Sequence, residues 1–205
     1  MTVTLEGWRI TGQPQIDSYV GTWVQFAATL VNRLAVTSAL GRSTQPPVSG
    51  LDRLAVVREV LAEGGWPPET TVSETDAHQL ADVATELSAV FCAGDALDSD
   101  RLNALLIRHA AVPNLHGGST HPYTLTFHRP GATIVDAWAA DAGTALAMVI
   151  GVGQSARLGH CQASSCDLVF FDTTRNASRR FCGVSCQNRV KASAYRARRG
   201  SPSPT

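Results

Sequence analysis

The chain has 205 residues, of which 44% are hydrophobic and 17% are charged, and its formal net charge is zero. This length and composition suit one globular domain with a small additional module. The first ten residues lack a basic region followed by an apolar run, and the longest weakly polar stretch, 137–153, is too short to cross a bilayer. We therefore expect a cytoplasmic protein with neither a secretory signal nor a membrane span.

Charge is distributed unequally along the chain. Residues 1–156 hold eight arginines and fifteen acidic residues, a net charge of −7, whereas residues 157–205 hold nine basic and two acidic residues, a net charge of +7. Such an asymmetry indicates two regions with different partners. We expect a domain at 1–153, a basic module at 154–199 and a disordered tail at 200–205.

Most of the first region has the periodicity of helices. Apolar residues at three- and four-residue steps predict a long helix from Ile16 to about Leu40. A loop over 41–50 separates it from three further helices, and Ser73 with Asp76 predicts a capping box at the start of the second of these. The predicted spans are 51–63, 73–92 and 98–111.

Short strands are expected at three places in the same region. Residues 1–12 suggest a first strand, and 123–127 and 133–138 alternate on either side of a Pro130-Gly131 corner, which predicts a hairpin. We expect this hairpin to pair with residues 3–10 in a small sheet, and a last helix to follow over 139–151. The predicted fold class is therefore α+β, mainly α.

Three aromatic residues of the N-terminal region allow two interpretations. Trp8 precedes the long helix, and Trp23 and Phe26 lie within it at helical spacing. They could line a pocket for an effector. They could also be ordinary core residues, which is the more common use of aromatics at this spacing.

Four cysteines near the C-terminus form two close pairs. Cys161 and Cys166 are separated by four residues, Cys182 and Cys186 by three, and fifteen residues lie between the pairs. Each pair can span one edge of a tetrahedron, and four thiolates are a usual ligand set of structural zinc sites. We predict that they bind one structural Zn²⁺ ion. The competing hypotheses are two disulfides, which would suit an exported protein, and ordinary buried thiols, which would not be expected to fall into two pairs.

The fifteen residues between the pairs, DLVFFDTTRNASRRF, are typical of a β-hairpin. Residues 168–171 favour a strand, 173–176 supply turn residues, and 179–181 return toward the second pair. A basic helical pattern follows Cys186. A treble-clef zinc finger typically consists of a zinc knuckle, a hairpin, a second ligand pair and a helix, and this segment is expected to have the same order.

In these motifs the chain resembles the CGNR zinc-finger family, which is named for a Cys-Gly-Asn-Arg run at the second ligand pair. Here the run is Cys186-Gln187-Asn188-Arg189, and the preceding FFDTTRNASRRFC and the trailing YRARR also match the family. Glutamine replaces the glycine, which removes no ligand. The resemblance implies an N-terminal, mostly helical ABATE domain over 1–153 that senses a small-molecule effector or a protein partner. It also implies a stress-induced transcription regulator.

The last helix is expected to have two different faces. Cys186, Val190, Ala194 and Ala197 share one side of a helical wheel, which we expect to pack on the zinc core, while basic residues occupy the opposite arc. Arginines on a rigid helix can neutralise phosphates and reach base edges, so we predict DNA binding with a steep salt dependence. The predicted contacts are Arg175, Arg179, Arg180, Arg189, Lys191, Arg196, Arg198 and Arg199.

Other functions remain open at this point. The basic face could instead dock an acidic protein, as in an interaction adaptor, or bind RNA. An enzyme is not expected, since the chain has no GxSxG, Walker or GxGxxG element. A homodimer would suit DNA binding, although no coiled-coil pattern argues for one.

Other metal-binding or nucleophilic side chains lie outside the zinc motif, among them one cysteine and a group of four histidines. The fifth cysteine, Cys92, is expected to be a core thiol rather than a nucleophile. No helix-spaced ligand pair supports a second metal site among the four histidines His109, His116, His121 and His128.

Overall fold

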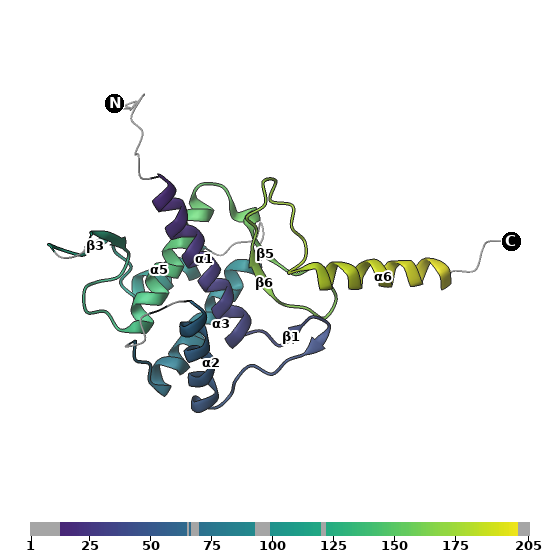
Figure 1. Cartoon of the computed structure of the whole chain (residues 1–205), viewed down its shortest axis with the longest axis horizontal. Helices are drawn as coiled ribbons and strands as arrows, with labels where there is room; N and C mark the ends of the chain where they lie inside the picture. The colour runs from purple at the N-terminus through teal and green to yellow at the C-terminus, as the bar shows by residue number, and fades with distance from the viewer. Residues whose placement is uncertain (1–12, 65, 67–69, 93–98, 120–121, 201–205) are drawn as a thin grey trace, which may run out of the picture.

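The computed structural model describes residues 13–64, 66, 70–92, 99–119 and 122–200. Within them lie six α-helices and three two-stranded antiparallel sheets, so the α+β, mainly α class is confirmed. The last helix projects from the body that the other elements form (Figure 1). The predicted strand over 1–12, its pairing with the hairpin, and the predicted tail after Gly200 lie outside the described residues.

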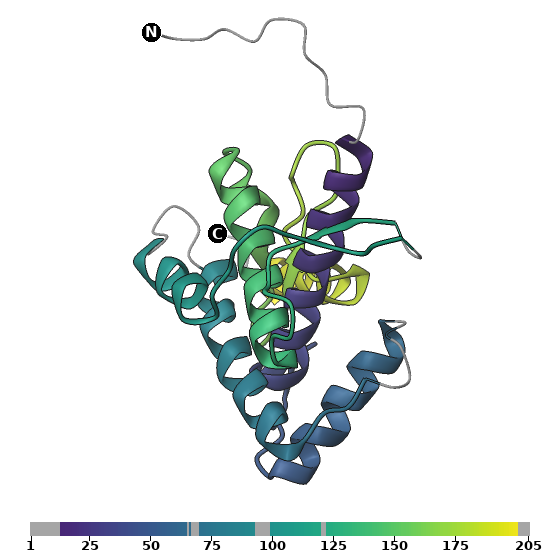
Figure 2. The ribbon, with the colours of Figure 1, turned by 90° about the vertical axis from the view of Figure 1, so that its left-hand side faces the viewer.

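Three long helices make the centre of the body. α1 (Gln13–Leu34), α3 (Glu74–Cys92) and α5 (Ile134–Gly151) pack against one another, α2 (Gly50–Glu63) packs on α1 and α3, and α4 (Ser99–Arg108) packs on α5 and α3. Figure 2 shows α1 beside α5, with α2 and α3 diverging from the lower end of the body. The predicted helices over 51–63 and 73–92 are confirmed, including the capping box in which Ser73 and Asp76 exchange hydrogen bonds.

The most deeply buried helix is α5. A Cβ on its Gly143 would lie 2.9 Å from Leu105 Cδ2 and 3.1 Å from Leu106 Cδ2, so glycine permits α4 to approach closely. By length and composition alone its 18 residues could cross a membrane. In this fold α5 is the core helix, because α1, α3 and α4 pack around it and Trp138 and Asp141 are fully buried.

The predicted hairpin across Pro130-Gly131 is wrong. β4 (Thr124–Thr126) pairs with the earlier β3 (Asn114–His116), and the residues after Thr133 begin α5. Thr133 Oγ1 accepts a hydrogen bond from the Asp136 backbone N–H at 3.1 Å, and its hydroxyl donates to the Asp136 carboxylate at 2.8 Å. This N-cap outweighs the preference of the β-branched residues that follow it for a strand.

The first helix, α1, ends at Leu34, six residues earlier than predicted. β1 (Ser38–Ala39) and β2 (Arg42–Ser43) pair there to form the 38–43 hairpin. Leu40 and Gly41 close it with positive φ angles of 53° and 87°. Two consecutive residues with positive φ make a hairpin turn and cannot continue a helix.

The last sheet joins the C-terminal segment to the helical body. After the 3₁₀ turn η2 (Ser155–Arg157), β5 (Leu158–His160) pairs with β6 (Val169–Phe171); β5 packs on α3, and β6 on α1 and α3. Leu158 and Val169 belong to the main hydrophobic core. The C-terminal segment and the helices therefore share one core, and the domain boundary at 153/154 stays a prediction.

Candidate metal centre

The two cysteine pairs converge on one point. The Sγ atoms of Cys161, Cys166, Cys182 and Cys186 all lie within 4.8 Å of one another; Cys166 to Cys182 is 3.8 Å and Cys182 to Cys186 is 3.6 Å. A tetrahedral Zn²⁺ ion with Zn–S bonds of about 2.3 Å requires sulfur atoms roughly 3.8 Å apart. All five cysteines of the chain are described and none forms a disulfide. The cluster therefore fits one structural Zn²⁺ ion.

The first pair lies in the loop of a β-hairpin. Cys161 follows β5 directly and Cys166 comes three residues before β6, so the knuckle, residues 161–166, connects two paired strands. The Cys161 N–H donates to the Leu168 carbonyl at 2.9 Å and closes this loop.

The predicted pairing of residues 168–171 with 179–181 is wrong, because both edges of β6 have other partners. β5 takes one edge. On the other edge the Asn32 side chain of α1 donates to the Val169 carbonyl at 2.9 Å and accepts from the Val169 N–H at 2.8 Å. These are the backbone groups that a second strand would need.

The second pair is positioned by the start of α6 (Val184–Gly200). Cys182 lies just before this helix and Cys186 in its first turn. The segment that leads to them is held by Asp172, whose buried carboxylate accepts hydrogen bonds from the Thr174 N–H at 2.8 Å and the Arg179 N–H at 2.7 Å. Burial acts to raise the pKa of Asp172, but a hydrogen bond from the Thr174 side chain, these two backbone N–H groups and the charge of Arg157 together outweigh burial and lower the pKa.

Backbone amides favour the thiolate form of one ligand. Burial acts to raise the pKa of Cys166, yet hydrogen bonds from the backbone N–H groups of Leu168 and Leu40 lower it, with Leu40 N 3.4 Å from Sγ. Burial raises the pKa of Cys182 and of Cys186. Because metals bind the thiolate, the backbone N–H groups of Leu168 and Leu40 assist coordination by Cys166.

The 38–43 hairpin of the helical body contacts the knuckle directly. In addition to the Leu40 hydrogen bond, the Gly41 N–H donates to the Ser165 carbonyl at 2.9 Å, and the Asp167 N–H donates to the Ser38 carbonyl at 2.8 Å. Sequence reasoning missed this contact. Leu40 lies 126 residues before Cys166, and its only local signal is the turn glycine that follows it.

One predicted nucleic-acid contact, Arg189, lies at the metal centre. Its Nη2 donates to the Ser164 carbonyl at 2.7 Å and lies 3.7 Å from Cys186 Sγ. A Cβ on Gly41 would overlap this guanidinium and displace it, and the positive φ of 87° also favours glycine there. Four thiolates with one Zn²⁺ carry a net charge of −2, which this guanidinium partly balances. Arg189 therefore joins α6 to the knuckle and packs beside Gly41 of the 38–43 hairpin.

We expect Arg189→Lys to weaken metal retention, because an ammonium group cannot reproduce the planar guanidinium contacts. Mutation of a residue that supports a metal ligand commonly lowers the affinity for the metal by about 10- to 100-fold. Zinc transfer to a colorimetric chelator should be roughly tenfold faster than in the unmodified chain. Gly41→Ala should act in the same direction, while Arg196→Ala, an exposed arginine of the same helix, should release zinc at the unmodified rate. Equal rates for Arg189→Lys and Arg196→Ala would contradict the assignment.

Two other predicted contacts also have partners within the finger. Arg179 donates to the carbonyls of Phe181 and Cys182, and its guanidinium lies 4.4 Å from the centre of the Phe170 ring. Arg180 donates through Nε to the Gln162 side chain at 2.7 Å. Both side chains are exposed on one side while they hold the segment before Cys182.

The remaining predicted contacts lie on the outside of the finger. Lys191, Arg196 and Arg198 are exposed on α6, and Arg175 is exposed on the loop after β6. Arg199 belongs to α6, but its side chain is outside the described part of the chain.

Beyond its second turn, α6 leaves the body (Figure 1). Val190 packs against the cysteine cluster as expected. The expectation that Ala194 and Ala197 also pack on the zinc core is wrong, because both are exposed. They border a groove of about 510 Å³ between the helix and the knuckle, across from Gln162 and Ser164.

The other candidate ligands do not form a second metal centre. Among the described residues, the cysteine cluster is the one group of three or more potential ligands that lie close enough together to hold a metal ion. His109 pairs with Asp136 and His128 with Asp141, and His121 lies outside the described residues. Cys92 is exposed at the end of α3, so the expectation of a core thiol is wrong.

Comparison with known families agrees with this geometry. Residues 157–199 match the family model of the CGNR zinc finger, a span that contains all four ligands, the segment between the pairs and almost all of α6. No curated protein matches the chain. The segment 157–199, with four thiols placed for one structural zinc ion, is a zinc finger of the CGNR family.

Proposed function

We propose that this chain is a cytoplasmic transcription regulator that binds DNA through the outer face of its zinc finger. The observation that carries the proposal is the exposure of Lys191, Arg196 and Arg198 on a helix that is anchored at Cys186 and then projects from the body (Figure 1). A 17-residue helix is about 25 Å long, and the major groove of DNA admits one α-helix.

Charge and rigidity support this proposal. Residues 157–205 carry +7 before metal binding, and about +5 with four thiolates and one Zn²⁺. The first two turns of α6 are held by Cys186, Val190 and Arg189, so the cations further along the helix are presented at a defined place. Arg175 and Arg180 lie on the loop side of the finger and extend the basic surface. Arg179 and Arg189 contribute by holding this surface in position.

DNA binding is tested by fluorescence anisotropy on a random duplex over a salt series. The logarithm of the binding constant should fall by about 0.9 for each phosphate contact per tenfold rise in salt. In Lys191→Ala/Arg196→Ala/Arg198→Ala the slope should be smaller by roughly two to three units. The matched control, Arg58→Ala/Arg129→Ala, removes exposed arginines of the helical body and should leave the slope unchanged.

The second candidate function is a protein-interaction adaptor. The groove between α6 and the knuckle favours it, because its lining of Gln162, Ser164, Val190 and Ala194 is mixed polar and apolar and lies beside Arg196. If the chain shows no binding to duplex DNA at about 50 mM salt, where electrostatic binding is strong, the adaptor becomes the better assignment. Anisotropy titrations with single-stranded RNA would show whether the chain binds RNA more tightly than duplex DNA.

The helical body is proposed to act as a sensor that modifies the function of the finger. The hydrogen bonds between the 38–43 hairpin and the knuckle support this part, since they join the two regions at the metal centre. A homodimer would allow two fingers to contact adjacent half-sites, and sedimentation with and without DNA tests it.

A further inference from the structure

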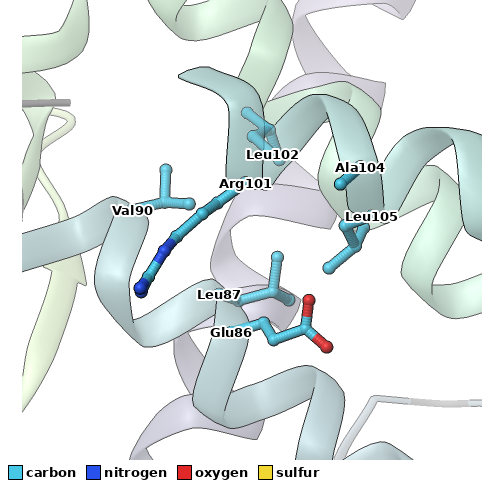
Figure 3. A pocket seen from close by; sticks show the side chains of 7 residues that line it. All are labelled: Glu86, Leu87, Val90, Arg101, Leu102, Ala104 and Leu105. Carbon is cyan, nitrogen blue, oxygen red and sulfur yellow. The ribbon is translucent and has the colours of Figure 1, made fainter. Parts of the chain in front are cut away.

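In the part of the helical body that the structure describes, a cavity and a larger groove differ in size and lining. The cavity between α3 and α4 measures about 280 Å³; its walls are leucines and Val90, with Glu86 and Arg101 at the edge (Figure 3). Glu86 is already bound to Arg108 at 2.5 Å. The groove between α1 and the end of α2 measures about 620 Å³, within the range of small-molecule sites.

Three partly exposed aromatic side chains line this second groove. Trp23 and Phe26 come from α1, and Trp66 follows α2. The Trp23 and Trp66 rings are 5.7 Å apart and inclined by 67°, and the Trp23 and Phe26 rings are 5.4 Å apart and inclined by 84°. Rings at such angles do not stack on one another, so they form a corner with aromatic surface on more than one side.

The corner is supported from beneath by the core. The buried Trp138 ring lies 4.7 Å from Phe26 and 5.0 Å from Trp66. Gly64 is also required, because a Cβ there would lie 2.8 Å from Trp66 Cδ1. The aromatic side chains are thus held in place before any ligand binds, which reduces the entropy cost of binding.

A carboxylate completes the edge of the groove. Glu63 at the end of α2 is one of its lining residues, and its side chain is 62% exposed. Arg33 lies between two carboxylates, 2.6 Å from Glu59 and 3.3 Å from Glu63, so this edge keeps a net negative charge. Residues 1–156 as a whole carry −7, which also attracts cations.

We propose that this groove binds a small organic cation of the methylated ammonium class. The faces of aromatic rings attract cations within about 6 Å, and Trp is the strongest of the three. A quaternary ammonium group is large, weakly hydrated and has no N–H to donate, so a corner of rings beside a carboxylate suits it. A ligand of this class would be the effector in the sensing role proposed above. Its biological purpose rests on that role, but its binding to the groove does not.

The test uses the intact zinc-loaded chain and two probes of nearly the same shape. Choline carries the positive charge, and 3,3-dimethyl-1-butanol is its neutral isostere. Tryptophan fluorescence and calorimetry should show saturable binding of choline at least about tenfold tighter than binding of the alcohol, since the charge is the attracted group. Equal affinities, or no saturable choline binding, would overturn the proposal.

Three variants locate the site through opposite effects. Glu63→Gln should weaken choline binding by roughly three- to tenfold, whereas Arg33→Ala should strengthen it, because it removes the competing cation from Glu63. Glu86→Gln, a carboxylate of the other cavity, should change nothing. The Glu63 and Arg33 side chains lie at the surface, so these changes do not depend on refolding of the core. Equal shifts in all three variants would mean a general charge effect and would overturn the assignment.

Occupation of the groove by a second copy of the chain is tested by repeating the choline titration at two protein concentrations. A second copy in the groove would compete with choline, so the apparent choline affinity would fall as the protein concentration rises, and this result would overturn the proposal. DNA affinity is measured separately on the unliganded chain. If choline does not bind, the salt dependence of DNA binding is unaffected. If DNA does not bind, the measured affinity for choline is unaffected.

Discussion

Removal of zinc should destabilise the helical body as well as the finger. β5 and β6 contribute Leu158 and Val169 to the main core, and the 38–43 hairpin is bonded to the knuckle. Without metal, the ion that holds the two cysteine pairs together is lost, while β5 and β6, on either side of the knuckle, remain packed on α1 and α3. Structural zinc supplies free energy of folding directly, so we expect a loss of at least about 3 kcal/mol from the cooperative unfolding of the helices.

The measurement is thermal unfolding followed by far-UV circular dichroism, with and without a chelator. A loss of about 3 kcal/mol lowers the midpoint by roughly 10 °C in a chain of this size. Cys166→Ser should reproduce the effect of the chelator, and Cys92→Ser should not, because Cys92 is exposed and lies outside the ligand set. If the helical transition kept its midpoint after metal loss, the segment 154–199 would be an independent domain on the helical body.

Replacement of the buried carboxylate of Asp141 should have the second large effect. This α5 side chain is fully buried and accepts hydrogen bonds from the Tyr19 hydroxyl at 2.7 Å and the Phe127 N–H at 2.6 Å, and its other oxygen lies 2.6 Å from His128 Nδ1. It thereby joins α1, α5 and the segment after β4. Asp141→Ala leaves these three groups without their acceptor, and we expect a loss of about 3–5 kcal/mol in the free energy of unfolding.

Denaturant titration of the zinc-loaded chain checks this value. Asp136→Ala, five residues earlier on the same helix, is the matched control. It removes a partly exposed carboxylate that accepts from the Thr133 hydroxyl and pairs with His109, keeps the backbone cap bond to Thr133, and should cost only about 1 kcal/mol. Similar losses in the free energy of unfolding of both variants would show that the buried Asp141 network stabilises the fold no more than the partly exposed Asp136 carboxylate does.

The metal ligands could be identified from the sequence because their signal is chemical and local. Four thiols in two pairs define a zinc site by residue type and spacing, and the four sulfur atoms do converge. α2 and α3 were predicted for a related reason, since capping residues and periodic apolar positions lie within one helix. The Asp141 network gave no such signal, because its partners Tyr19, Phe127 and His128 lie 122, 14 and 13 residues away along the chain.

Two of the errors occurred where strand propensity competed with another interaction, a helix cap in the first case and a contact from a distant helix in the second. Residues 133–138 have strand formers, but a Thr133 cap and a core position for Trp138 make them helical. Residues 168–171 do form a strand, yet Asn32 of α1 occupies the edge that 179–181 were expected to use.

The sequence by itself determined the zinc ligands, the main helices and the concentration of positive charge in the last quarter of the chain. Only the tertiary structure decided that Arg189 lies beside the ligand cysteines, that Leu40 donates to Cys166, and that Trp66 forms a corner with two rings of α1. The physical reason is that coordination chemistry and helix capping depend on neighbours along the chain. These other contacts depend on which backbone and side-chain groups remain unpaired after the helices have packed, and no local pattern contains that information.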